Sequence, residues 1–197
     1  MGVNLSLPSG LYPFMQATQL WPALLLGIFL CTCDRAPQDA PVSYEGKFYD
    51  LAGYMDAEMA RLAVAHPTAD KTIVLNGTEE SKRGVAIDYA ADLRLFRQAD
   101  INKPAWEDKY RTETEALSAG HRRTHYVATD SSLVVRRITV EEDQGETTEI
   151  RIERRTGNVL SDGRHELTYA PARGYRVVTE QTNRFGDDVD ATVVVRW

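Results

Sequence analysis

Cysteine is scarce in this chain of 197 residues, in which only Cys31 and Cys33 occur. Two cysteines separated by one residue cannot form an ordinary disulfide, and they are too few for a zinc site, which takes three or four ligands. The part of the chain after Cys33 must therefore be stabilised by packing and hydrogen bonds.

A long hydrophobic run is also lacking. The longest apolar stretch, Leu20 to Leu30, has about 11 residues, whereas a helix that crosses a bilayer needs about 20. A short run that is followed closely by Asp34 and Arg35 is typical of the core of an export signal peptide. No Lys or Arg precedes Arg35, so the usual basic start is missing unless translation begins at Met15 and the free amino group supplies the charge.

The end of this run has the pattern of a lipid attachment site. Leu30-Cys31-Thr32-Cys33 resembles the bacterial lipobox, in which a leucine lies three residues before the acylated cysteine, although Thr32 is bulkier than the usual Gly or Ala. We predict a signal peptide over residues 1–32, a lipidated Cys33 with a polar tether over 33–46, and a single domain over 47–197. The alternatives are a buried cysteine pair in a membrane-proximal helix, a Cys-x-Cys metal fragment, and myristoylation at Gly2.

Positive charge is too sparse for a nucleic-acid-binding protein. Residues 1–33 carry no charged side chain, so the whole net charge of −6 lies on the predicted mature part. Nucleic-acid binding is not expected, because it requires a basic surface. The chain also lacks a Gly-x-Ser-x-Gly elbow, a phosphate-binding glycine loop and a His-Glu-x-x-His helix. We therefore expect no cofactor and no metal, and favour a binding role over catalysis.

The first half of the predicted domain has helix and hairpin signals. Apolar residues from Phe48 to Leu62 recur at three- and four-residue steps, which predicts a helix that Pro67 must end. The strand-like run Thr72–Leu75 is followed by Asn76-Gly77, a strong hairpin signal, so a second strand is expected at about 78–85.

A second helix is predicted after this hairpin. Asp88 can cap it, and it would run to about Ala99 with Tyr89, Leu93 and Phe96 on its buried side.

The second half has the signals of an antiparallel meander. Strands are expected at 133–142 and 147–155, with turns at 155–158, 161–163 and 172–174. In the last strand, alternate residues from Val189 to Trp197 are apolar, so one face of the sheet is predicted to be buried. The fold class is α+β, with two N-terminal helices and a hairpin packed on a twisted antiparallel sheet formed mainly by the C-terminal half.

Two groups of polar residues could carry chemistry. His121 and His125 are four residues apart, but we place them on a loop and a strand, where they are too distant to bind one metal. The acidic clusters at 141–143 and 187–190 are interpreted as turn residues. Glu141 and Asp143 are the acid pair that an envelope hydrolase would need, and this is the least supported function.

The segment from Asp100 to Tyr110 offers large amphipathic side chains. Pro104, Trp106 and Tyr110 could contact a partner, or they could cover the core. A tryptophan that follows a helix more commonly packs over the hydrophobic core.

Several motifs resemble those of a group of small lipoproteins from Bacteroidota with no established activity. The most specific is Asp100-Ile101-Asn102-Lys103-Pro104-Ala105-Trp106, with Asn76-Gly77, Leu167-Thr168-Tyr169 and Gly174-Tyr175 as further matches over most of the mature chain. The resemblance implies a diderm envelope with attachment to the outer membrane, and it supplies no catalytic residues.

These observations lead to three functional hypotheses. The first is a lipid-anchored cell-envelope protein that acts as a binding or assembly module, with an envelope protein as its partner. The second is a periplasmic carrier of a hydrophobic ligand, enclosed between a curved sheet and the helix that contains Met55 and Met59. The third is the envelope hydrolase.

Overall fold

The computed structural model describes residues 46–197. The predicted signal peptide, Cys33 and nearly all of the tether lie outside the described residues. The helical elements are short apart from the first, and their bounds are α1 Leu51–Ala65, α2 Tyr89–Asp92, α3 Arg94–Arg97 and the 3-10 helix η1 Pro104–Trp106. Within residues 46–197, no helix has the length and apolarity needed to cross a membrane.

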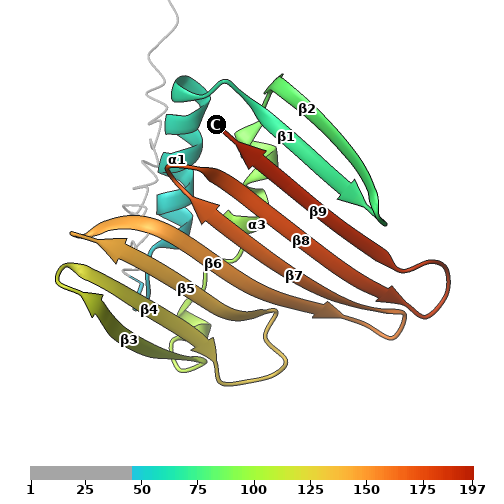
Figure 1. The fold of residues 1–197 in the computed structure, drawn as a ribbon. Helices are drawn as coiled ribbons and strands as arrows, with labels where there is room; N and C mark the ends of the chain where they lie inside the picture. The colour runs from blue at the N-terminus through green and yellow to red at the C-terminus, as the bar shows by residue number, and fades with distance from the viewer. Residues whose placement is uncertain (1–45) are drawn as a thin grey trace, which may run out of the picture. The chain divides into compact units, whose positions relative to one another are not determined.

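A nine-stranded antiparallel sheet forms most of the fold (Figure 1). The strands are β1 Thr68–Leu75, β2 Thr78–Ala86, β3 Tyr110–Ser118, β4 His121–Ala128, β5 Val135–Asp143, β6 Glu146–Gly157, β7 Ser161–Ala170, β8 Gly174–Asn183 and β9 Val189–Arg196. Their order in the sheet is β2-β1-β9-β8-β7-β6-β5-β4-β3. Strands β3 to β9 thus form a continuous meander, and the hairpin β1–β2 joins it at β9.

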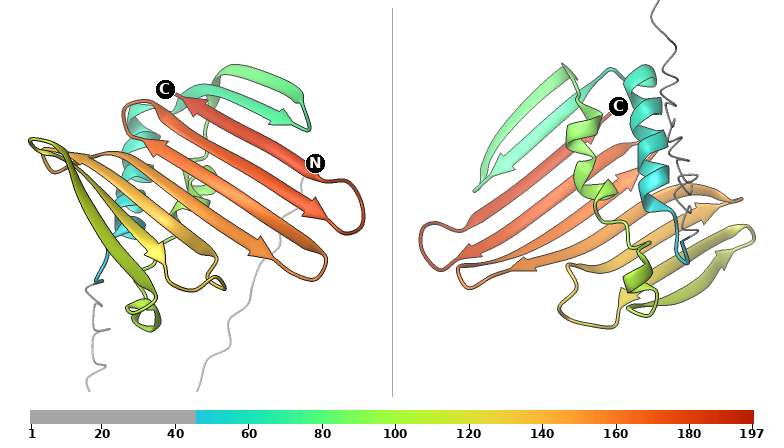
Figure 2. Two further views of the ribbon diagram at one scale, coloured as in Figure 1. Left: turned by 60° about the horizontal axis from the view of Figure 1, so that its bottom comes forward. Right: turned by 180° about the vertical axis from the view of Figure 1, so that it is seen from behind.

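The helices lie on one face of this sheet (Figure 2). Because β2 and β3 are its two edges, the segment that contains α2, α3 and η1 must cross from one edge to the other. We call the face under the helices the inner face and the opposite one the outer face. Tyr169 and Val195 point inward and are buried, whereas Arg151 and Arg176 point outward and are exposed.

Aromatic rings fill the space between sheet and helices. Phe96 packs edge-on against Tyr169 and Tyr175, with ring centroids 6.1 and 6.3 Å apart. Trp197 lies 6.2 Å from each of these tyrosines, and its indole N–H donates to the carbonyl of Pro171 at 3.1 Å. The alternation predicted for the last strand is confirmed, because Val195 and Trp197 both face this core.

Two predicted hairpins have the backbone geometry that their sequences require. Asn76 and Gly77 have φ of 48° and 81°, and Gln144 and Gly145 have 52° and 87°. A two-residue turn with positive φ at both positions matches the twist of the strands that it joins. The hairpins β1–β2 and β5–β6 are therefore confirmed.

Both predicted helical regions form, and the apolar residues that define them are buried or half-buried. Asp50 caps α1 by accepting from Gly53 N–H at 2.9 Å. Asp88 caps the next helix by accepting from Ala91 N–H at 3.1 Å, and Phe96 is fully buried as expected. The predicted helix 88–99 is interrupted at Leu93, however, so it forms α2 and α3.

The α+β class is confirmed, but its details need correction. The sheet dominates and the helices are not N-terminal, but the predicted order of a helix, a hairpin and a further helical region is found. The hairpin does not pack on the sheet, because β1 pairs with β9 and covers an edge that would otherwise be unpaired. The turn predicted at 161–163 is also wrong, since these residues begin β7.

The segment from Asp100 to Asn102 has a structural role. Asn102 hydrogen-bonds the backbone of Phe48 and Tyr49, just before α1. Ile101 is buried in the core. This segment therefore fixes the start of α1 next to the start of the meander.

Candidate functional site

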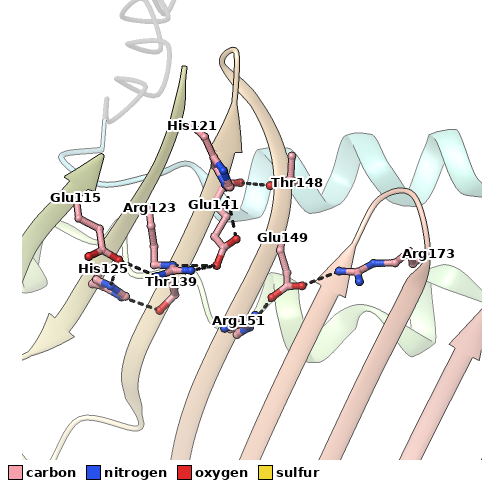
Figure 3. A network of polar contacts seen from close by, with 10 residues as sticks. All are labelled: Glu115, His121, Arg123, His125, Thr139, Glu141, Thr148, Glu149, Arg151 and Arg173. Carbon is pink, nitrogen blue, oxygen red and sulfur yellow. Dashed lines mark hydrogen bonds and ion pairs between the residues drawn. The ribbon is translucent and has the colours of Figure 1, made fainter. Parts of the chain in front are cut away.

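The outer face carries a network of ion pairs that crosses strands β3, β4 and β5 (Figure 3). Glu115, Arg123 and Glu141 lie directly opposite one another in this sheet. The guanidinium of Arg123 donates to Glu141 at 2.9 Å and to Glu115 at 2.8 Å. Cross-strand pairs of opposite charge stabilise the solvated face of a sheet, so this network is explained without a ligand.

The two histidines flank Arg123 on the same strand. His121 Nε2 lies 3.8 Å from Glu141, and His125 Nε2 lies 3.8 Å from Glu115. Both residues belong to β4, so the loop position predicted for His121 is wrong; the β3–β4 turn is tight and ends before it. In the described part of the chain, no group of three or more His, Cys, Asp or Glu side chains is arranged to hold a metal ion.

The acid pair proposed for a hydrolase is placed on this outer face. Glu141 is engaged by Arg123, and Asp143 is exposed at the β5–β6 turn. The geometry gives Glu141 an ion-pairing role in the sheet.

A second polar group lies on the outer face where β8 begins. Glu149 accepts from Arg173 at 2.8 Å and also pairs with Arg151. Arg173, Arg176 and Arg196 surround a shallow depression of about 380 Å³. Arg176 and Arg196 form no ion pair with a described residue, but both are exposed. Water therefore solvates their charges, and their lack of a partner costs little.

The inner face holds an arginine in a different situation. Arg154 lies on β6 with the same inward orientation as Ile150 and Ile152. It is half-buried, its Nε atom is inaccessible to solvent, and it has no hydrogen bond or ion pair with any described residue. Burial lowers the pKa of Arg154 from its ordinary value, because none of the carboxylates in residues 46–197 pairs with its charge.

Hydroxyl groups and an imidazole lie beside Arg154. His165 is directly opposite it on β7, and Thr179 is opposite His165 on β8. His165 Nδ1 is 3.1 Å from the Thr179 hydroxyl, and its Nε2 is 3.3 Å from the Thr156 hydroxyl. Burial, and then the charge of Arg154, lower the pKa of His165. His165 is therefore neutral at pH 7, and either ring nitrogen can exchange donor and acceptor roles with a hydroxyl.

The absence of a side chain at Gly163 keeps this cluster open. A Cβ atom there would lie 2.7 Å from the Thr156 hydroxyl and 3.4 Å from His165 Nε2. Together, Arg154, Thr156, His165 and Thr179 are half-buried and offer a positive charge and several hydrogen-bonding groups on the inner face. Such a set is suited to an anionic group, since guanidinium and hydroxyl donors are the usual partners of carboxylates and phosphates.

The three residues proposed for partner binding are placed differently from one another. Tyr110 is buried and donates its hydroxyl proton to the carbonyl of Val135 at 2.9 Å, and burial raises its pKa to about 12. Tyr110 is thus a core residue and offers no surface to a partner. Trp106 is half-buried with Lys103 over its ring at 4.0 Å, and Pro104 is exposed at the start of η1. These two remain as a prediction.

The space that a carrier would need under α1 is occupied. Met55 is fully buried and Met59 packs against the same core, in which Tyr54 and Tyr169 also pack with ring centroids 6.3 Å apart. The helices do not cover the whole inner face, and the strand ends that extend past them remain as a second possible place for a ligand (Figure 2).

Sequence reasoning missed Arg154, although a signal was present. Ile150 and Ile152 indicate that even-numbered positions of this strand face the core, and Arg154 continues that series. A charged residue at a position expected to be apolar is the feature that distinguishes it from Arg151 and Arg155.

No protein-family model matches this chain, and neither a curated protein nor a solved structure matches it. Its function must therefore be argued from the residues themselves.

Proposed function

We propose that this protein is a lipid-anchored cell-envelope binding module that recognises an anionic group on the inner face of its sheet. The anchor is Cys33, and the compartment is the envelope of a diderm bacterium, with the outer membrane as the expected site of attachment. An export-type hydrophobic run and the lipobox-like Leu30-Cys31-Thr32-Cys33 support this location.

The observation that carries the binding role is that the half-buried charge of Arg154 has no partner among the described residues. The Nε atom of Arg154 is inaccessible to solvent and unpartnered within the described part of the chain, and an unsatisfied buried polar group costs roughly 1–3 kcal/mol. Arg123 on the outer face, by contrast, pairs with two glutamates. A bound anion would accept hydrogen bonds from Arg154, and relief of its unsatisfied state would contribute to the free energy of binding.

The binding role is tested with the simplest anions. We expect sulfate and inorganic phosphate to shift the NMR signals of the Arg154 Nε–H and the His165 ring, and we expect Arg154→Met to abolish the saturable shift. The matched control is Arg155→Met, which removes the neighbouring arginine on the outer face, where it is exposed and pairs with Asp162. An anion response that survives Arg154→Met, or that Arg155→Met removes equally, would refute the proposed site.

The anchor is tested separately by membrane fractionation and intact mass. In a Bacteroidota host, we expect the wild-type protein to be acylated at Cys33 and to sediment with membranes. Cys33→Ala should lose the acyl mass and the membrane association. An unmodified wild-type protein in the soluble fraction would refute the lipoprotein hypothesis.

A further inference from the structure

Part of the inner face extends beyond the helices. The ends of the strands that carry the β6–β7 and β8–β9 turns reach past α1 and α3 (Figure 2). Apolar side chains lie on this uncovered region. Ile73 and Leu75 are 37% and 51% exposed, and Val177 and Val193 are half-buried at the margin of the core.

Strand register places these apolar residues on the same face of the sheet as Arg154 and His165. In antiparallel sheets, directly opposed residues share a face. One inward-facing row crosses β6, β7, β8, β9 and β1 as Arg154, His165, Thr179, Ala191 and Leu75. The adjacent row crosses the same strands as Ile152, Leu167, Val177, Val193 and Ile73.

The polarity of the surface changes along these rows. On β6 and β7 it presents the charge of Arg154 and the ring of His165, whereas on β9 and β1 it presents aliphatic side chains. Adjacent strands are about 4.8 Å apart, so the four steps from β6 to β1 cover about 19 Å. This distance accommodates a charged headgroup at one end and an extended hydrocarbon chain toward the other.

We propose, on the basis of the binding role above, that the ligand is an anionic amphiphile with a single alkyl chain. Its headgroup binds Arg154 and the Thr179 hydroxyl, and its chain lies across Val177, Val193 and Ile73 toward Leu75. Charge complementarity places the headgroup at Arg154, because this arginine forms no ion pair within the described part of the chain. The exposed aliphatic side chains place the alkyl chain on β9 and β1, since an apolar region beside a polar site is typical of a ligand-binding surface.

The chain-length dependence of binding tests this assignment. The probes are sulfate, octanoate and dodecanoate, all below the micellar range, added to the full-length chain that carries Cys33→Ala so that no acyl group competes. Each methylene that is fully buried strengthens binding roughly fourfold, so even partial burial of four more methylenes predicts at least about tenfold tighter binding of dodecanoate than of octanoate.

Variants on β1 separate the two parts of the site. The double variant Ile73→Thr, Leu75→Thr removes exposed apolar groups from the inner face, and Val74→Thr is the matched control on the outer face of the same strand. We expect the double variant to abolish the chain-length dependence while sulfate binding is unchanged. Val74→Thr should leave both unchanged, and Arg154→Met should weaken the binding of all three probes.

The outcomes distinguish this inference from the proposed function. If sulfate and octanoate bind through Arg154 but dodecanoate binds no more tightly, the amphiphile assignment is wrong and the anion-binding role stands. If no probe binds in a manner that depends on Arg154, the proposed function and this inference both fail. Equal chain-length dependence in the wild type and the double variant would also overturn the placement of the chain.

Discussion

The side chain of Asn102 and the backbone of Phe48 bind each other in both directions. The Phe48 N–H donates to Asn102 Oδ1 at 2.9 Å, and Asn102 Nδ2 donates to the Phe48 carbonyl at 3.2 Å. The same Nδ2 donates to the Tyr49 carbonyl at 2.9 Å. One amide therefore satisfies three backbone groups that precede α1, more than fifty residues away in the sequence.

Removing this amide should destabilise the domain. We expect Asn102→Ala to lower the free energy of unfolding by about 1–3 kcal/mol, because partly buried backbone groups lose their partners. Urea unfolding at pH 7 measures the change. The exposed Gln98, whose side chain has no hydrogen bond to a described residue, provides the control, and Gln98→Ala should shift stability by less than about 0.5 kcal/mol. Equal stability of Asn102→Ala and wild type would show that water replaces the amide.

The aromatic cluster makes a second prediction about stability. Trp197 contacts Tyr89, Tyr169 and Tyr175 and donates a hydrogen bond to Pro171. We expect Trp197→Ala to cost about 2–4 kcal/mol, somewhat less than a fully buried tryptophan because it remains partly exposed. Phe185→Ala is the aromatic control, since Phe185 is 77% exposed and should be near neutral. The prediction fails if the two variants unfold at the same urea concentration.

The buried carboxylate of Glu58 predicts a loss of stability in acid. Burial opposes its ionisation, but hydrogen bonds from Arg61 and Tyr169 outweigh that effect and hold the pKa of Glu58 below its ordinary value of 4.5. The folded state therefore favours the ionised form. This contribution is fully present above about pH 4.5 and is lost as the pH falls through the lower folded pKa.

Glu58→Gln isolates this contribution from those of other acids. We expect the variant to be less stable than the wild type at pH 7, by about 1–3 kcal/mol, and the difference to shrink steadily below pH 4.5. Urea unfolding at several pH values measures both. A difference that stays constant down to pH 3 would contradict the depressed pKa.

The imidazole of His165 reports on the charge of Arg154. Burial, and then the positive charge of Arg154, hold the pKa of His165 below 6.5. In Arg154→Met, the pKa should rise but remain below 6.5, because burial persists. Proton NMR titration of the ring, assigned with His165→Asn, measures it. Saturating sulfate should also raise the pKa of His165 in the wild type, because the bound anion offsets the charge of Arg154. If the pKa of His165 changes in neither experiment, the charge of Arg154 does not act on His165.

Local sequence signals predicted much of the fold. The cap at Asp88, the turn at Asn76-Gly77 and the alternation up to Trp197 act within a few residues of the chain, so they can be recognised without knowledge of the partners. The break at Leu93 was not predictable in this way. Leu93 is fully buried, so packing against the core overrides the helical pattern there.

The sequence by itself determined the composition of the two sheet faces, because alternation along each strand decides which side chains point the same way. The tertiary structure alone decided how the strands are ordered, since the pairing of β1 with β9 joins segments more than a hundred residues apart. It also brought Arg154, His165 and Leu75 into one row, a position that depends on the register of five strands. Contacts that depend on several non-local pairings leave no local pattern, and for this reason the candidate site appeared only in the folded domain.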